Sequence, residues 1–330
     1  MERTIVWAVD AFEPPGDLFN SAVRILQVIQ EKLDASIQPL YVLTPSQINL
    51  STEFSEISES PATDYYRPAA ERALSEAIKD FALPRMLPPK ILTVDSTSTH
   101  MAIDALSRYS DQIGAEVIVV SSHGRSGLGR FLLGSFAETL ILYSKRPVIV
   151  VHPGSKVAHD GPLKKLLVPS DLTEGALPYW LESLELAKKM GQDVMLFHCV
   201  PFPVEPVIQS GVYLLGGGWM PIHAYMGEEV QRRQARLDQW VDVARKQGLQ
   251  VSGSIYAEGG GIADAILRIA KEENAGMIAM AIQSGPITSA IIGSVTREVV
   301  RRAPCPVWIL RHAARKTGRK GGEKKPEAAA

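Results

Sequence analysis

The sequence has only two cysteines, almost no net charge and no long apolar run. Each of these features argues against one class of protein. Cys199 and Cys305 have no metal-type spacing, so we interpret them as buried, inert thiols in a reducing compartment. A formal net charge of −1 offers no general attraction to nucleic acid or to an anionic membrane. No apolar stretch approaches the roughly 20 residues that a membrane-spanning helix needs, and the run at 4–9 is too short for a secretory signal. We therefore expect a cytoplasmic protein without nucleic-acid or membrane partners.

What the sequence does contain is the same set of landmarks twice. A chain of 330 residues, 45% of them hydrophobic, is long enough for two domains with separate cores. A strand that ends in Asp, a Gly-Ser step that opens a helix and a closing strand entered through proline all recur at offsets of 159 to 161 residues: Asp10 and Asp171, Gly134 and Gly293, Pro147 and Pro306. We predict two domains of similar fold at 1–153 and 154–312, followed by a disordered basic tail at 313–330.

Within each unit, strand and helix patterns alternate. In the first, apolar residues at spacings of three and four predict helices around 22–33, 70–81 and 102–109. Apolar runs predict strands at 5–10, 40–43, 90–94, 117–120 and 147–151. This alternation predicts an α/β fold with two doubly wound, Rossmann-like domains, each with a mainly parallel five-stranded sheet. Two inserts, at 44–64 and 201–227, lie outside this pattern, and the polar one at 44–64 is expected to be a loop.

One loop has the composition of a phosphate-binding site. The segment from Ser121 to Arg130 is rich in glycine and follows the most apolar strand, and a helix is expected to start at Gly134-Ser135. Glycines let backbone N–H groups approach phosphate oxygens, and a helix N-terminus adds partial positive charge. The sequence has neither a Walker-type loop nor a G-x-G-x-x-G after the first strand, so neither a P-loop nor a dinucleotide fingerprint is present.

The segment from Val117 to Ser135 resembles the signature of the universal stress protein family. The family's ATP-binding members have a glycine, two residues, a second glycine, nine residues and then Gly-Ser or Gly-Thr. Here Gly124, nine residues and Gly134-Ser135 match, whereas Ser121 replaces the first glycine. The resemblance covers nearly the whole chain twice and implies a tandem universal stress protein of the UspA-like, adenine nucleotide alpha hydrolase-like type.

The resemblance also implies where a nucleotide would bind. Asp10 matches an Asp near the adenine, and Val42 matches a backbone position that holds the adenine edge. The predicted site comprises the following residues of the first unit: Asp10, Val42, Ser121, His123, Gly124, Arg125, Gly134, Ser135 and Phe136. Its ligand would be ATP or another adenine nucleotide, with or without Mg²⁺. If the backbone of Ser121 has a positive φ, a residue other than glycine costs roughly 1–2 kcal/mol; otherwise its hydroxyl can help to hold phosphate.

The corresponding loop of the second unit is degenerate. Ala281 and Ser284 replace the paired glycines and Pro286 stiffens the loop, so we expect weak or no ATP binding there. Pro169-Ser170-Asp171 and Gly293-Ser294 are nevertheless retained.

Several of these residues also have a purely structural interpretation. Asp10 and Asp171 can buttress the turn after a strand. His123 suits an exposed loop, and Arg130 a solvated helix surface. His198 lies within an apolar strand and is expected to be a core histidine rather than a ligand. The apolar, glycine-rich segment 211–221 is either a loop packed on its own domain or a lid or interaction surface.

Two functional hypotheses follow. The first is a stress-response regulatory protein that binds an adenine nucleotide through its first domain, with the two domains paired as an intramolecular pseudo-dimer through 148–151 and 307–310, and with a homodimer of whole chains as a further option. The second is a nucleotide-independent interaction or scaffold protein that uses segment 211–221. No catalytic residue or metal site is predicted, because no residue qualifies as a base, and slow ATP hydrolysis would be the upper bound of any activity.

Overall fold

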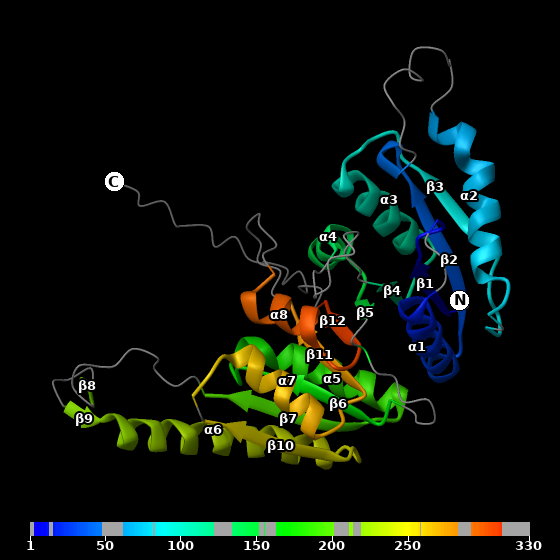
Figure 1. Ribbon diagram of the computed structural model, residues 1–330. Coiled ribbons are helices and arrows are strands. Elements are labelled where there is room, and N and C mark those ends of the chain that lie inside the picture. Colours follow the sequence, from blue (N-terminus) through cyan, green and yellow to red (C-terminus); the bar gives the residue numbers. More distant parts are fainter. Residues whose placement is uncertain are drawn as a thin grey trace, which may run out of the picture.

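A computed structural model describes residues 3–12, 16–47, 62–81, 83–121, 134–151, 155, 163–200, 211–213, 219–257, 259–282 and 292–311 (Figure 1). Within these ranges, only the backbone is described for 62–64, 211–213 and 219–225.

The first half of the chain contains five parallel strands. They are β1 (Arg3–Ala8), β2 (Ala35–Leu43), β3 (Lys90–Thr93), β4 (Val117–Ser121) and β5 (Val148–Val151). Their order in the sheet is β3-β2-β1-β4-β5. The chain therefore moves outward from β1 in one direction and then reverses to β4, which places a topological switch point between β1 and β4.

The second half has the same order. Its strands are β6 (Lys165–Pro169), β7 (Asp193–Cys199), β10 (Val251–Tyr256), β11 (Met277–Ala281) and β12 (Val307–Leu310), arranged as β10-β7-β6-β11-β12 and again all parallel. The predicted fold class, two doubly wound α/β units with five-stranded sheets, is confirmed.

Helices cover both faces of the sheet because nearly every central strand is apolar on both sides. One hydrophobic core lies under α1 (Asp17–Leu33), α2 (Ala62–Ile78), α5 (Leu177–Met190) and α6 (Ile222–Arg245). The other lies under α3 (Thr99–Gln112), α4 (Ser135–Tyr143), α7 (Ile262–Glu272) and α8 (Ser294–Arg302). Two short 3₁₀ turns, Pro45–Gln47 and Glu174–Ala176, follow β2 and precede α5, respectively.

The two halves share one continuous sheet. Strands β5 and β12 pair antiparallel, with Trp308 opposite Ile149, so that the ten strands form one hydrogen-bonded sheet. Helix α1 packs against α5 on one face. On the other face, Arg297 of α8 forms an ion pair with Glu138 of α4. The segments expected to pair, 148–151 and 307–310, are therefore hydrogen-bonded neighbours.

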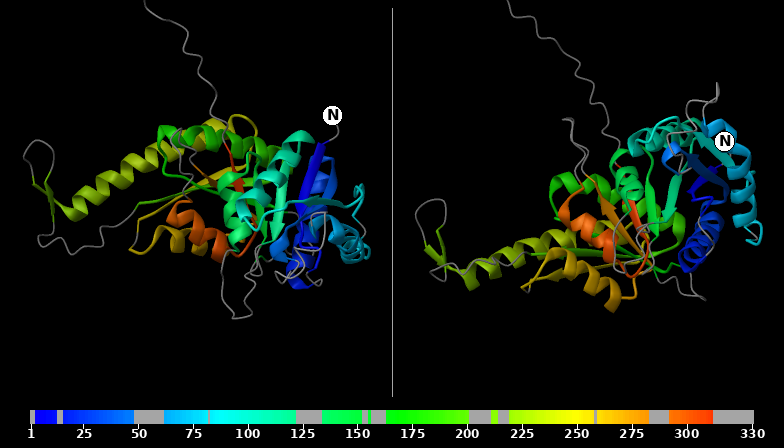
Figure 2. Two further views of the ribbon diagram at one scale, coloured as in Figure 1. Left: turned by 90° about the horizontal axis from the view of Figure 1, so that it is seen from above. Right: turned by 45° about the horizontal axis from the view of Figure 1, so that its top comes forward.

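Both inserts contain regular structure, including the one at 44–64 that was expected to be a loop. Helix α2 begins at Ala62, inside the insert expected at 44–64, and α6 begins at Ile222, inside the insert expected at 201–227. Segment 211–221, for which a packed loop and a lid or interaction surface were both left open, contains the antiparallel strands β8 (Gly211–Tyr213) and β9 (Trp219–Pro221). Aromatic and β-branched residues on either side of a glycine run favour such a hairpin. The hairpin lies at the far end of α6, away from both halves of the large sheet (Figures 1 and 2).

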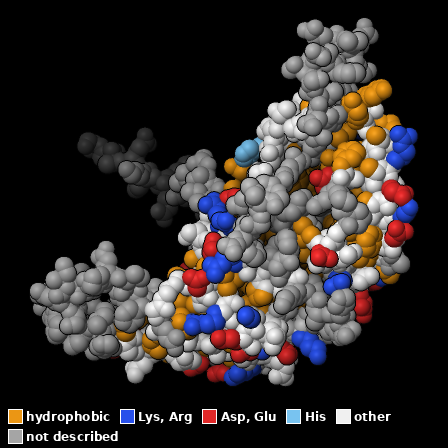
Figure 3. Space-filling view, in the orientation of Figure 1, with side chains coloured by type: hydrophobic (Ala, Val, Ile, Leu, Met, Phe, Trp, Pro, Cys, Tyr) orange, Lys and Arg blue, Asp and Glu red, His pale blue; other side chains and the backbone are white. Residues whose placement is uncertain are grey.

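The described surface has no strong charge asymmetry on the face shown in Figure 3, where acidic and basic side chains are interspersed over the second half. Among the described residues, no helix combines the length and apolarity needed to span a bilayer. The domain limits at 153 and 312 fall outside the described residues and stay a prediction.

Candidate functional site

The predicted site of the first half is assembled at one edge of the sheet. Asp10 follows β1, Val42 lies near the end of β2, and Ser121 is the last residue of β4. Since β4, β1 and β2 are adjacent and parallel, these three residues lie at the carboxyl ends of neighbouring strands, beside the switch point where ligands of doubly wound folds bind.

The start of α4 supplies the second part of this site. Gly134 is the N-cap, with an extended backbone at φ −61° and ψ 143°, and Ser135 is the first helical residue. Phe136 packs against the core between the sheet and α4. The other three predicted residues, His123, Gly124 and Arg125, belong to segment 122–133 and lie outside the described residues.

Ser121, the residue that departs from the family pattern, is not strained. It lies in an extended strand, pairs with Val151 of β5 and is not among the residues with positive φ. The cost that a non-glycine residue would carry in the left-handed region therefore does not apply here. Its hydroxyl stands at the edge where the glycine-rich segment begins.

Asp10 and Asp171 buttress the turns that follow the first strand of each half. The Oδ1 atom of Asp10 accepts a hydrogen bond from the backbone N–H of Phe12 at 3.0 Å. The Oδ1 atom of Asp171 accepts from the backbone N–H of Thr173 at 2.9 Å and from the Thr173 hydroxyl at 2.8 Å. The structural interpretation of both carboxylates is thus correct, and it leaves Oδ2 of each without a protein partner in the described part of the chain.

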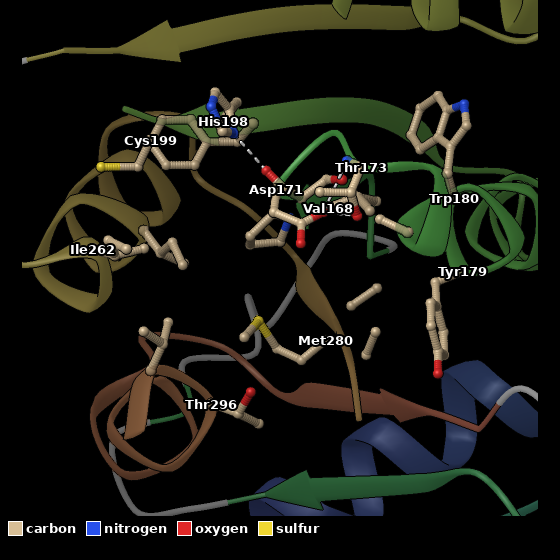
Figure 4. A pocket seen from close by; sticks show the side chains of 18 of the residues that line it. Val168, Asp171, Thr173, Tyr179, Trp180, His198, Cys199, Ile262, Met280 and Thr296 are labelled. Carbon is tan, nitrogen blue, oxygen red and sulfur yellow. Dashed lines mark hydrogen bonds between the residues drawn. The ribbon is translucent and has the colours of Figure 1, made fainter. Parts of the chain in front are cut away.

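The second half contains a cavity of about 690 Å³ at the matching edge of its sheet (Figure 4). Its floor is formed by the carboxyl ends of β6, β7 and β11, and its sides by α5, α6, α7 and the start of α8. Trp180 and Tyr179 lie on one side and Ile262 and Cys199 on the opposite side (Figure 4). A volume of this size, with mostly apolar walls and a few polar groups, is typical of small-molecule sites.

His198 lines this cavity and is only 6% exposed. Its Nδ1–H donates to the carbonyl oxygen of Ser170 at 2.8 Å, which fixes the ring and its tautomer and leaves Nε2 as an acceptor. Burial lowers the pKa of His198, an effect that the Ser170 hydrogen bond opposes and the nearby Arg233 reinforces. The imidazole is therefore neutral near pH 7. Its burial matches the prediction of a core histidine, but its place in a cavity wall was not predicted.

An ion pair on α6 closes the same side of the cavity. Nε of Arg233 donates to Glu229 at 2.7 Å and its Nη1 donates to the carbonyl oxygen of Asp171 at 3.1 Å. Hydrogen bonding by Arg233 lowers the pKa of Glu229. Two N–H groups of the guanidinium thus bind protein acceptors, and they tie α6 to the turn after β6.

The opposite wall is held by hydrogen bonds within the protein. The Tyr179 hydroxyl donates to the carbonyl oxygen of Ile282 at 3.1 Å, and the Ser183 hydroxyl donates to the carbonyl oxygen of Tyr179 at 2.8 Å. Burial raises the pKa values of Tyr179 and Cys199, so both groups are protonated at neutral pH and the thiol is a poor nucleophile.

The register of the strands shows which residues of the first half correspond to the residues that line the cavity of the second half. In the first half, the N–H of Val9 donates to the carbonyl oxygen of Leu40; in the second half, the N–H of Ser170 donates to that of Phe197. Leu40 and Phe197 therefore hold equivalent positions. The next residues along each strand then correspond, Tyr41 to His198 and Val42 to Cys199. By the same register, Trp7 corresponds to Val168 and Phe12 to Thr173.

These first-half counterparts are large and pack on one another. The rings of Phe12 and Tyr41 meet edge to face at 5.8 Å, and those of Trp7 and Phe19 at 4.9 Å. The second half has small side chains at two of the matching positions, Val168 and Thr173. Sequence reasoning missed this cavity, although comparing residue sizes between the two halves would have indicated it.

Comparison with known proteins identifies the family of both halves. The family model described as "Universal stress protein family" matches residues 1–152 and 162–311. A curated universal stress protein of Mycolicibacterium smegmatis is 28% identical over 214 residues, which is 60% of this chain. The match spans 62% of that relative's length.

Two solved structures share the fold over almost the entire chain. A universal stress protein from Archaeoglobus fulgidus aligns with 93% of this chain and 98% of its own, at a TM-score of 0.58 and 20% identity. A putative universal stress protein from Pseudomonas aeruginosa aligns with 94% and 93%, at a TM-score of 0.57 and 14% identity. At these identities the likeness concerns the fold alone.

Proposed function

Because the chain belongs to the universal stress protein family, we propose that it is a stress-response regulator that binds ATP or a related adenine nucleotide through its first half. The observation that carries this proposal is the meeting of Asp10, Val42 and Ser121 at one sheet edge, next to the N-terminus of α4 at Gly134-Ser135. A helix N-terminus favours phosphate through its free N–H groups and its dipole.

The nucleotide would act as a ligand rather than as a substrate. Asp10 is engaged in its turn through Oδ1, and it is the carboxylate that the proposal places near the base rather than near the phosphates. Binding would bias the conformation or the partner choice of the protein. The two buried free cysteines support the cytoplasmic setting expected from the sequence, and the antiparallel pairing of β5 with β12 supports an intramolecular pseudo-dimer.

Isothermal titration with ATP, with and without Mg²⁺, tests this function on the full chain. We expect one site in the wild type and a loss of binding in Gly124→Val, because a β-branched side chain would block the approach of phosphate to the backbone. Ser284→Val places the same side chain at the corresponding position of the second half and serves as the matched control, which should keep its affinity. ATP binding that survives Gly124→Val would refute the first-half site.

The alternative is a nucleotide-independent interaction protein. The observation that favours it is the position of the β8–β9 hairpin at the end of the 24-residue helix α6, away from the large sheet. Absence of heat with every adenine nucleotide, together with loss of a purified partner's binding when 211–221 is replaced by a short glycine linker, would favour this alternative over the nucleotide site.

A further inference from the structure

The ten-stranded sheet ends in two unlike edge strands. At one end, β3 has only four residues, begins with Lys90 and follows Pro88-Pro89. At the other end, β10 has six residues, Val-Ser-Gly-Ser-Ile-Tyr, without a charge or a proline (Figure 1). Short strands, lysine and proline are means by which proteins keep a free sheet edge from pairing with another chain. The β3 edge has all three, and β10 has none of them.

Three residues of β10 turn their backbone groups away from the rest of the sheet. The carbonyl oxygens of Gln250 and Tyr256 accept hydrogen bonds from the N–H groups of β7 and of the residue that follows it. Because the backbone groups of successive residues in a strand point to opposite sides, the even-numbered residues of β10 face β7 and the odd-numbered ones face outward. The outward residues are Val251, Gly253 and Ile255. In the described part of the chain, no strand pairs with this outer side.

One of the outward groups has a side-chain partner. Nε of Arg245 donates to the carbonyl oxygen of Val251 at 2.8 Å, as expected for a carbonyl that β7 does not occupy. A carbonyl oxygen has two lone pairs, so this contact leaves room for a second hydrogen bond. Among the described residues, the outward N–H groups of Gly253 and Ile255 have no hydrogen-bond partner.

The middle of β10 presents small, uncharged side chains. Gly253 lies against α6, where an added Cβ would collide with Leu237 and come within 3.1 Å of Val241. The odd-numbered residues therefore face α6, and the serines at 252 and 254 lie on the opposite face. Ser252 is exposed and Ser254 is half-buried. An approaching strand would thus meet neither a charge nor a bulky side chain at the centre of this edge.

The edge is complementary to itself. Two copies of β10 that run antiparallel about a two-fold axis at Gly253 place this glycine opposite its equivalent and Val251 opposite Ile255. All the outward residues then lie in hydrogen-bonded pairs of an antiparallel ladder, and the axis satisfies both copies at once. Ser252 lies opposite Ser254, so no like charges meet. The chain already contains one junction of this kind, since β5 and β12 pair antiparallel and neither strand carries a charge.

We propose that the outer edge of β10 is a homodimer interface, in which two whole chains pair antiparallel through residues 251–255 and extend the sheet from one molecule into the other. The occupant is a second copy rather than a foreign peptide, because one register about Gly253 pairs every outward group of both strands. The interface is independent of the proposed nucleotide site, since β10 and the strands β1, β2 and β4 lie in different halves of the sheet.

Sedimentation equilibrium of the full chain measures this dimer directly. We expect the wild type to sediment at twice its 36.0 kDa. Ile255→Pro removes an outward N–H and keeps the hydrogen bonds to β7, which proline allows at a sheet edge. Because the two-fold axis repeats the change, this variant should weaken the dimer by at least about tenfold. Ile255→Ala keeps the N–H while it shortens the side chain, so it is the matched control and should stay dimeric.

Two double variants test the register. Ser252→Lys with Ser254→Lys places lysine opposite lysine in the dimer and should give monomers. Ser252→Lys with Ser254→Glu places lysine opposite glutamate and should restore the dimer. Circular dichroism checks that each variant is folded.

Three results would overturn the proposal. The first is a wild type that stays monomeric at every concentration measured, which would leave the edge to an extended segment of another protein. The second is a dimer that persists unweakened in Ile255→Pro or in the variant with two lysines. The third is a second double variant that is as monomeric as the first.

Discussion

Arg297 of α8 and Glu138 of α4 form an ion pair that joins the two halves of the chain. Nη2 of Arg297 in α8 lies 2.7 Å from Oε1 of Glu138 in α4. Each helix starts at the Gly-Ser step of its own half, so the ion pair connects the two candidate sites on the same face of the sheet.

The ion pair can be tested by exchanging its charges. Arg297→Glu and Glu138→Arg should each reduce the free energy of unfolding by about 0.2–1 kcal/mol, because the pair is partly exposed and each change leaves like charges together. The double variant should recover most of the loss. Urea unfolding of the four proteins measures the coupling, and additive single effects would show that the contact contributes nothing.

Gly276 lies where the residues just before β6 pass close to the start of β11. A Cβ at this position would lie 2.9 Å from Cα and 3.0 Å from C of Leu163, which are backbone atoms that cannot turn aside. Gly276→Ala should therefore lower the free energy of unfolding by about 1–3 kcal/mol. The corresponding residue of the first half is Glu116. Its N–H donates to the carbonyl oxygen of Thr4, just as the N–H of Gly276 donates to that of Lys165.

Gly227 in α6 is the control for this substitution, because its Cβ would meet nothing within 4 Å. Gly227→Ala should raise stability by about 0.5–1 kcal/mol through helix propensity. Thermal unfolding of both variants checks the pair, and equal shifts in the two would contradict the close approach at Gly276.

The burial of His198 predicts a loss of stability in mild acid. The groups around this imidazole are the Ser170 carbonyl, Arg233, Asp171 and Glu229, and burial is the largest influence that lowers its pKa. The unfolded chain therefore takes up a proton at a higher pH than the folded one does. The contribution of His198 to stability is complete above its ordinary pKa of 6.5 and is lost as the pH falls through its lower folded value.

Urea unfolding between pH 7.5 and 5 tests this dependence. The decline below pH 6.5 should become shallower in His198→Gln than in the wild type, and it should persist in His100→Gln, which changes an exposed histidine of α3. A slope that His198→Gln leaves unaltered would show that other groups cause the decline.

Cys305 should be unreactive in the folded protein. It is 1% exposed, and burial raises the pKa of its thiol to about 12, so the thiolate population near pH 8 is negligible. In a Cys199→Ser background, a thiol reagent should label Cys305 only as fast as the protein unfolds. Labelling that keeps pace with free cysteine would indicate that this part of the core opens locally.

The fold was predictable from the sequence because each central strand is apolar on both sides and each helix has an apolar face. The strand Val117 to Val120 and its neighbours identify the parallel sheet directly. The Gly-Ser step at Gly134-Ser135 likewise predicted where α4 starts, since glycine and serine are suited to the extended N-cap and the first turn.

The second cavity was not predictable in the same way. Its volume depends on side chains from α5, α6, α7 and several strands, which only the folded chain brings together. His198 lies among apolar residues in β7, a pattern that indicates a core position and gives no sign of a cavity. The hairpin at 211–221 was missed because a glycine run predicts a turn without specifying whether strands flank it.

The antiparallel junction of β5 and β12 has a consequence for how the two candidate sites can change. In a pair of identical chains joined by the same strands, one substitution alters both binding sites at once. Here the partners are unlike segments of a single polypeptide, so replacing Phe12 leaves Thr173 untouched. A substitution can therefore alter the ligand specificity of one half without altering that of the other, although both halves share one sheet.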